Sequence, residues 1–148
     1  MADTSIRWAV AKQLVQMVRD QPAATGVLVE PGWPGDQFMK PDMLWIDEIG
    51  STEADVPVMT GGRSHRDDRF TIVFLSRVAG RKDLDATLTR LEEIGALLED
   101  PPADTATLDD FPGVVSADYA LTDMTCGRTP DGCLGFARHE VRVHSRLT

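Results

Sequence analysis

The stretch that decides the fold is Arg69-Phe70-Thr71-Ile72-Val73-Phe74-Leu75-Ser76-Arg77-Val78, in which apolar side chains recur with a period of two. This period is typical of a β-strand, because successive side chains of a strand point to opposite faces of its sheet. One face carries Phe70, Ile72, Phe74 and Val78. The other face carries Val73 and Leu75. Apolar residues on both faces predict a strand at the centre of the sheet.

Further strands are predicted before this stretch. Val27–Glu30 is a short apolar run that ends at the turn signal Pro31-Gly32-Trp33-Pro34-Gly35, and Met43–Ile49 is a second candidate. The segment Glu53–Arg69 is polar and contains glycine, which indicates a projecting loop or hairpin.

Two amphipathic helices are predicted from apolar residues at helical spacing. The first covers Ser5–Arg19. The second covers Leu84–Leu98, with Asp83 as a cap at its start and Pro101-Pro102 as a stop after its end.

The first helix carries a second apolar strip. Trp8 and Val15 lie seven residues apart, on the side away from the main apolar stripe. Two arrangements explain the strip equally well: the helix is packed on both sides within its own domain, or it meets another subunit.

The last two strands are expected to be Val114–Thr125 and Gly135–Leu147, joined as an antiparallel hairpin. The final strand alternates between a mostly apolar face and a charged one. The charged face consists of Phe136, Arg138, Glu140, Arg142, His144 and Arg146. A solvated sheet face is the commoner explanation, whereas the arginines favour contact with a neighbouring subunit.

Length and composition limit the class of protein. The 148 residues suit one domain, 1–148, and 42% hydrophobic and 26% charged residues are usual for globular proteins. The order of elements predicts an α+β fold: a mainly antiparallel or mixed sheet flanked by two main helices, with projecting loops or hairpins. The sequence has neither a signal peptide nor eighteen consecutive apolar residues, so we expect no secretion and no contact with a membrane.

The charge of the chain is strongly acidic, with a formal net charge of −9 at pH 7. DNA phosphates would be repelled, which disfavours tight binding of nucleic acid. An acidic surface loop is predicted between residues 99 and 112, where five carboxylates occur: Glu99, Asp100, Asp104, Asp109 and Asp110. The one basic cluster contains Arg63, His65 and Arg66, and a loop tip explains it more simply than a binding site does.

The sequence contains no motif for catalysis or for a cofactor. It lacks a G-x-S-x-G elbow, a P-loop and a G-x-G-x-x-G motif. Two cysteines and two histidines form a C-x6-C-x5-H-x4-H series: Cys126, Cys133, His139 and His144. Its first spacing is too long for an ordinary zinc knuckle, and the two histidines would point to opposite faces of a regular strand. We expect no metal, no cofactor and no enzymatic activity, with both cysteines free in a reducing cytoplasm.

A different class, a small enzyme or a ligand-binding domain, would need a pocket. Trp33, Trp45 and Tyr119 are the candidate walls of such a pocket. Against this class stands the lack of a clustered nucleophile, base and oxyanion donor in the sequence.

The order of the predicted elements resembles the tail terminator, or tail completion, proteins of siphophages, which are long-tailed bacteriophages. Three segments carry the resemblance: the central strand segment Arg69–Phe74, the helix Leu84–Leu98 and the closing strand Gly135–Leu147. The resemblance covers nearly the whole chain in the order of its elements.

This resemblance implies a structural virion protein that is not an enzyme. Such proteins form a hexameric ring on the upper end of the tail tube, where they block further polymerisation and face the neck of the head. The implied partners are further copies of the chain, the major tail tube protein and a head–neck connector or stopper protein. The implied location is the head-proximal end of the tail, after assembly in the host cytoplasm. Another neck protein, such as a head completion or stopper protein, is the alternative.

Candidate contact regions follow from the same resemblance. Subunit and tube contacts would lie in Gly50–Asp68 and in Thr125–Leu134. Together with the second apolar strip and the charged strand face, the candidate interface residues are Trp8, Val15, Arg63, His65, Arg66, Arg138, Glu140, Arg142, His144 and Arg146.

A ring of this kind must let DNA pass without specific binding. About six subunits would carry a formal charge of about −54, or 6 × −9, and an acidic channel would repel the phosphates. We therefore expect Asp104, Asp109 and Asp110 to line the channel. The alternative is that this polar loop faces the outer solvent.

Overall fold

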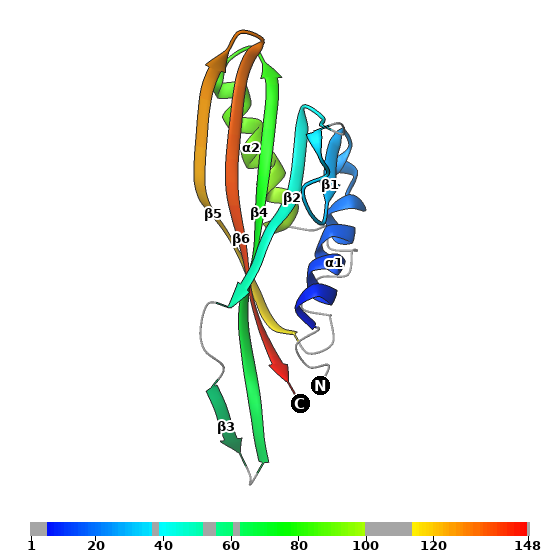
Figure 1. Ribbon diagram of the computed structural model, residues 1–148, viewed down its shortest axis with the longest axis vertical. Coiled ribbons are helices and arrows are strands. Elements are labelled where there is room, and N and C mark those ends of the chain that lie inside the picture. The colour runs from blue at the N-terminus through cyan, green and yellow to red at the C-terminus, as the bar shows by residue number, and fades with distance from the viewer. Residues whose placement is uncertain (1–5, 37–38, 52–55, 61–62, 100–113, 148) are drawn as a thin grey trace.

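Figure 1 shows a computed structural model of the chain, which describes residues 6–36, 39–51, 56–60, 63–99 and 114–147. A mixed β-sheet and two α-helices form an elongated α+β domain, which confirms the predicted fold class. The helices are α1 (Ile6–Arg19), the short 3-10 helix η2 (Pro22–Ala24) and α2 (Leu84–Glu99). The strands are β1 (Val27–Glu30), β2 (Asp42–Ser51), β3 (Val56–Thr60), β4 (Arg63–Arg81), β5 (Val114–Thr129) and β6 (Gly132–Leu147).

Strand β4 lies at the centre of the sheet, as the apolar pattern on both of its faces predicts. The strands follow the order β1-β2-β4-β6-β5, and β3 pairs with the first part of β4. Strands β1 and β2 pair in parallel, and the other described pairs are antiparallel. A parallel pair needs a crossover connection, and the chain between β1 and β2 supplies it.

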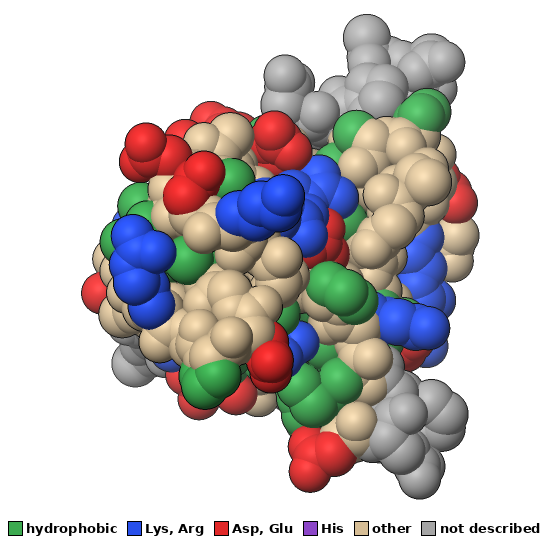
Figure 2. All heavy atoms as spheres, turned by 90° about the horizontal axis from the view of Figure 1, so that it is seen from above, with side chains coloured by type: hydrophobic (Ala, Val, Ile, Leu, Met, Phe, Trp, Pro, Cys, Tyr) green, Lys and Arg blue, Asp and Glu red, His purple; other side chains and the backbone are tan. Residues whose placement is uncertain are grey.

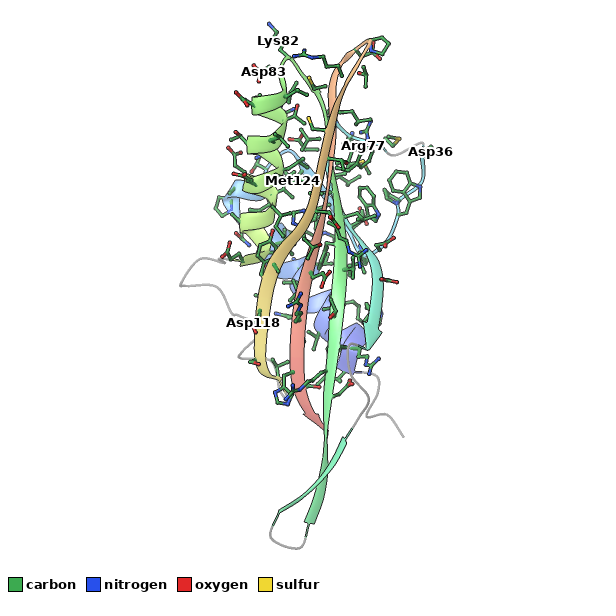
Figure 3. The ribbon with its side chains drawn as sticks, turned by 90° about the vertical axis from the view of Figure 1, so that its left-hand side faces the viewer. Asp36, Arg77, Lys82, Asp83, Asp118 and Met124 are labelled. Carbon is green, nitrogen blue, oxygen red and sulfur yellow. The ribbon has the colours of Figure 1, made fainter. Side chains whose placement is uncertain are left out.

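The core lies between the sheet and the two helices. Helix α2 lies behind β4, β5 and β6 in Figure 1 and to one side of them in Figure 3. Residues of α1 and α2 join one apolar cluster with Phe70, Ile72 and Phe74 of β4, which are completely buried. Burial of one large apolar side chain contributes about 1.5–3 kcal/mol, so this side of β4 is the main source of stability.

Helix α2 starts at the predicted cap and lies unusually close to β6. The backbone N–H of Ala86 donates a hydrogen bond to Oδ1 of Asp83 over 2.7 Å. Gly135 of β6 leaves room for the helix, because a Cβ atom there would lie 2.6 Å from Cγ2 of Thr87 and 2.9 Å from Cδ1 of Leu91. The absence of a side chain at this position therefore sets the distance between helix and sheet.

Two hairpins extend toward opposite ends of the long axis (Figure 1). The predicted projecting segment forms a hairpin in which Val56–Thr60 pairs with Arg63–Asp67. The β5–β6 hairpin is longer than predicted, because pairing continues to Thr129 and Gly132. Gly132 has φ +130°, a backbone conformation that favours glycine, which explains this residue at the turn.

Of the two arrangements left open for the second apolar strip on α1, Val15 has the first: it packs within its own domain and is not an interface residue. Val15 is 3% exposed and belongs to the core cluster, whereas Trp8 is 45% exposed. The helix lies deep enough in the core for more than one apolar stripe to be buried, and of this strip only Trp8, near the first turn, remains accessible. Trp8 is therefore the only one of the two that can meet another molecule.

We expect Gly135→Ala to destabilise the fold by about 1–3 kcal/mol, the usual cost of overpacking, because the new methyl group would collide with Thr87 and Leu91 of α2. Urea unfolding followed by circular dichroism measures the change. Gly127→Ala is the matched control on the same hairpin, since nothing lies within 4 Å of the Cβ position there. Equal loss in both variants would show that glycine acts through backbone freedom rather than through close packing.

Candidate interaction surface

One face of the sheet, opposite the helices, carries no helix in the described part of the chain (Figure 3). The register identifies its side chains, because Leu75 of β4 pairs with Trp45 of β2 and with Arg138 of β6. We call this surface the open face. Its members on the two central strands are Arg69, Thr71, Val73, Leu75, Arg77, Ala79, Leu134, Phe136, Arg138, Glu140, Arg142 and His144.

A series of ion pairs crosses the open face. An Nη2 atom of Arg138 lies 3.6 Å from Glu48 on β2, and its Nε lies 3.6 Å from Glu140. Glu140 also pairs with Arg142, at 3.4 Å. Accessible pairs of this kind contribute about 0–1 kcal/mol each, so they do not hold the sheet together. They place the guanidinium groups of Arg138 and Arg142 beside Glu140 at the surface.

The upper end of the open face is aromatic. Trp33, in the connection between β1 and β2, is 48% exposed and packs against Trp45 with ring centres 4.9 Å apart. Phe136 is 42% exposed, and its partner in the register is Arg77. The Nη1 of Arg77 donates a hydrogen bond to the backbone oxygen of Lys40 over 3.0 Å, so this guanidinium lies between Phe136 and the connection. Aromatic residues and arginine are enriched in the centres of protein interfaces.

The predicted alternation of the last strand is confirmed. His139, Val141 and Val143 are buried beneath the helices, whereas Arg142 is exposed on the open face. His144 is half-buried on the open face, so the two histidines point to opposite faces, as expected. The charged strand face is thus a real surface of the folded chain.

Several other predicted residues are placed only by backbone register or lie outside the described part of the chain. Arg63, His65 and Arg66 pair with Thr60, Val58 and Pro57 in the projecting hairpin, and Arg146 pairs with Asp67. The side chains at these positions lie outside the described residues. The acidic residues Asp104, Asp109 and Asp110 fall in 100–113, which also lies outside them.

An ion pair that no sequence pattern predicted connects α1 to the sheet. Arg7 donates from Nε and Nη2 to the two oxygens of Asp68, over 2.8 and 2.5 Å, and Asp68 is 1% exposed. The guanidinium also lies 5.5 Å from the ring centre of Phe70. A bidentate pair fixes direction as well as distance, so it orients the start of α1, next to the exposed Trp8.

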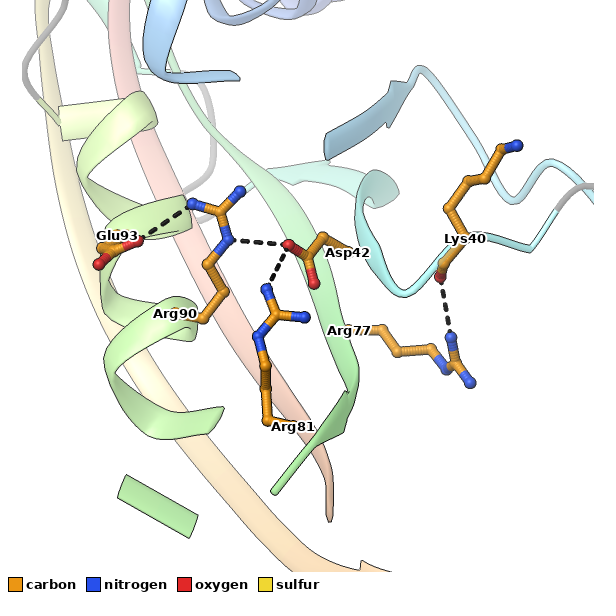
Figure 4. Close-up of polar contacts among 6 residues, drawn as sticks. All are labelled: Lys40, Asp42, Arg77, Arg81, Arg90 and Glu93. Atoms are coloured by element: carbon orange, nitrogen blue, oxygen red, sulfur yellow. Dashed lines mark hydrogen bonds and ion pairs between the residues drawn. The ribbon is translucent and has the colours of Figure 1, made fainter. Parts of the chain in front are cut away.

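A second buried carboxylate joins three elements (Figure 4). Oδ2 of Asp42, at the start of β2, accepts hydrogen bonds from Arg81 at the end of β4 and from Arg90 of α2, each over 2.8 Å. Arg90 also donates to Glu93 over 3.0 Å. Because Asp42 is buried, the two arginines neutralise a charge that would otherwise be costly. The network holds α2 against the sheet at its upper end.

A buried chain of polar side chains lies under α2. The imidazole of His139 is hydrogen-bonded through Nε2 to the hydroxyl of Ser76 and through Nδ1 to the hydroxyl of Tyr119, each over 2.8 Å. Gly95 of α2 leaves room for Tyr119 and His139, since a Cβ atom there would collide with the tyrosine hydroxyl. Burial lowers the pKa of His139 from 6.5 to about 4. Burial, and then the charge of Glu99, raises the pKa of Tyr119 to about 12.

The distance between Ser76 and His139 would suit a nucleophile and its base, but both residues are completely buried. No substrate can reach them in this conformation. The predicted pocket with walls at Trp33, Trp45 and Tyr119 is also not formed, because Tyr119 lies on the helix side of the sheet and the two tryptophans lie on the other. The chain is therefore organised around surfaces rather than around an enclosed cleft of these residues.

Two surface hollows are lined mainly by polar and charged side chains. One, of about 490 Å³, lies beside Arg90 and Glu93, and the other, of about 300 Å³, lies beside Arg69 and Arg142 on the open face. Arg90, Glu93 and Arg142 already form ion pairs with neighbours in the same chain.

The described residues were compared with the requirements of a metal site and of a membrane-spanning helix. No group of three or more potential metal ligands occurs among them. Cys126 and Cys133 are both free thiols, and their partners in the register are Gly135 and Arg128. No helix in the described ranges has the length and hydrophobicity that a membrane crossing requires.

The buried His139 makes the fold sensitive to acid. The unfolded chain takes up a proton on this side chain near pH 6.5, and the folded chain does so only near pH 4. The stability that neutral His139 contributes is therefore fully present above pH 6.5. As the pH falls from 6.5 toward 4, the free energy of unfolding decreases by roughly 3 kcal/mol. Urea unfolding of the protein and of a His139→Gln variant at pH 7.5 and pH 4.5 measures this. An equal loss in both would show that other groups cause it.

The Asp42 network gives a second test of the packing of α2. Asp42→Asn should lower the free energy of unfolding by roughly 2–4 kcal/mol, because Arg81 and Arg90 lose their shared carboxylate. Glu93→Gln is the control: its side chain is largely exposed, and the loss should stay below about 1 kcal/mol. Similar losses in the two variants would contradict a special role for the buried carboxylate.

Comparison with known proteins gives likenesses among solved structures and none in sequence. No protein-family model and no curated protein matches the chain. Among solved structures, a chain of one described as "Virion of native gene transfer agent (GTA) particle" is similar over 90% of this chain and 91% of that chain, with a TM-score of 0.49 and 11% sequence identity. No conclusion about function rests on a likeness of this degree.

Proposed function

We propose that this protein is a non-catalytic subunit of a phage-like virion, in which about six copies form a ring that closes the tail tube and joins it to the head–neck connector. The observation that carries the proposal is the open face. It combines exposed Trp33 and Phe136 with surface arginines and has no helix over it in the described ranges. A second copy that covers it would remove these aromatic rings from water, which is the main source of free energy in association.

The elongated shape supports the same proposal. The β3–β4 hairpin and the β5–β6 hairpin lie at opposite ends of the long axis (Figure 1). In a ring whose axis runs along this direction, one set of hairpins would face the tail tube and the other the neck. Residues 50–68 and 125–134 are therefore the proposed contacts with the tube and the connector.

The acidic composition fits the passage of DNA through such a ring. We place Asp104, Asp109 and Asp110 at the channel, where a negative lining would repel the phosphates. The electrostatic potential of an assembled ring, together with the position of residues 99–112, tests this placement. A basic bore would refute the repulsion argument, and an acidic bore with this segment on the outer rim would refute only the choice of residues.

The alternative within the same class is a head completion or stopper protein. Binding experiments with purified tail tube protein and with purified connector separate the two. A tail terminator should bind the end of the tube and stop its growth, whereas a stopper should bind the connector and leave the polymerisation of free tube protein unchanged.

Arg142→Glu should weaken ring formation while the fold is retained. Arg142 is exposed on the open face, and the new carboxylate would lie beside Glu140 at the surface. Mass photometry of the wild type, alone and with tube protein, should show rings that the variant loses, with little change in melting temperature. Lys82→Glu, an equal change of charge at an exposed position between β4 and α2, outside the open face and outside residues 50–68 and 125–134, should keep the rings. A wild type that is monomeric under all these conditions would refute the proposed function.

A further inference from the structure

Helix α2 presents an outer stripe that no described element of the chain covers. Its exposed residues recur every three or four positions and are either acidic or small. They are Asp85, Ala86, Thr89, Glu92, Glu93, Ala96 and Glu99. The one cation within the helix, Arg90, already pairs with Asp42 and Glu93, so the stripe is strongly negative. Acidic side chains gather at one side of the upper end of the molecule (Figure 2).

The open face has the complementary character. Its two central strands contribute four arginines, Arg69, Arg77, Arg138 and Arg142, and a single carboxylate, Glu140. Further carboxylates, Glu48 on β2 and Asp118 and Asp123 on β5, lie on the flanking strands, so the positive charge runs along the middle of the face. Trp33 and Phe136 lie at the upper end of the face, near β4 residues 75–77, where α2 lies on the other side of the sheet.

From this arrangement we infer that the outer stripe of α2 of one copy docks on the open face of the next copy. Small side chains at Thr89 and Ala96 let the helix approach the exposed aromatic rings closely, and Glu92 and Glu99 meet the arginine row. The two surfaces lie on opposite sides of one subunit, so each copy offers one and accepts the other. Contacts between unlike surfaces produce rings when the rotation closes. The inference rests on the proposed function and specifies how its subunits meet.

The free edge of the sheet is a poorer candidate for this contact. Strand β5 has no partner on its outer side among the described strands, but its pairing with β6 is broken by irregularities at Val114/Ser116 and Leu121/Asp123. Bulges and charged residues such as Asp118 are the means by which edge strands avoid pairing with another chain. Contact through the faces is therefore favoured over extension of the sheet.

Two variants, each with one altered surface, test the inference. Phe136→Glu changes only the open face, and the double variant Glu92→Lys/Ala96→Arg changes only the outer stripe of α2. Each should lose ring formation, with an association at least about tenfold weaker than that of the wild type. Asp20→Lys, at an exposed position after α1 and outside both surfaces and both proposed contact segments, is the control for a change in charge and should form rings. Melting temperatures confirm that each variant is folded.

Mixing the two variants gives the decisive measurement. One copy with an intact open face and one copy with an intact α2 stripe can still make a single contact, so sedimentation velocity should show a species of twice the subunit mass only in the mixture. The inference would be overturned if the mixture showed no such species, or if either variant alone formed rings. The proposed function would still stand in that case, provided that the wild type forms rings. A wild type that never assembles, with or without tube protein, would overturn both.

Discussion

The structure depends on one constraint, which is that β4 buries side chains on both of its faces. Phe70, Ile72 and Phe74 are completely buried beneath the helices, and Val73 is 3% exposed on the other side. A strand with two buried faces must be flanked by strands, and β4 pairs with β6 from Arg66 to Arg81 and with β2 from Phe70 to Val78. The positions of both helices and of both hairpins follow from this central strand, because each of them is attached to it directly or through one neighbour.

The spacing of apolar residues in the sequence predicted the helices and strands well, because each spacing corresponds to one local backbone geometry. It identified the central strand, both helices and the two faces of β6, and the predicted hairpin around residues 53–69 is present. It could not decide between the two arrangements of Val15, because the depth of a helix in the core depends on the sheet beneath it rather than on the helix itself. The open face was predicted only in part, since Trp33 and Arg77 reach it through the sheet register and the β1–β2 connection.

The buried polar contacts could not be predicted from sequence at all. Arg7 and Asp68 are 61 residues apart in the chain, and Ser76 and His139 are 63 residues apart. No local pattern reports such pairs, because each residue type is common at a surface and only the register brings the partners together. These contacts restrict orientation, because each hydrogen-bonded pair has one geometry that satisfies both of its groups. Apolar packing alone would allow several orientations of the helices on the sheet, and the polar contacts select one of them.

The open face has a composition intermediate between a core and a solvated surface. Val73 and Met43 are buried there without a helix above them, beneath neighbouring side chains and the β1–β2 connection. A fully apolar face would make the free subunit aggregate, and a fully polar face would give little free energy on contact. In the proposed ring, aromatic rings set among arginines would avoid both outcomes, because the net charge of −9 would keep free subunits apart until a complementary acidic surface approached in the correct orientation. The proposed ring subunit, which would have to stay dispersed before it assembles, requires this balance.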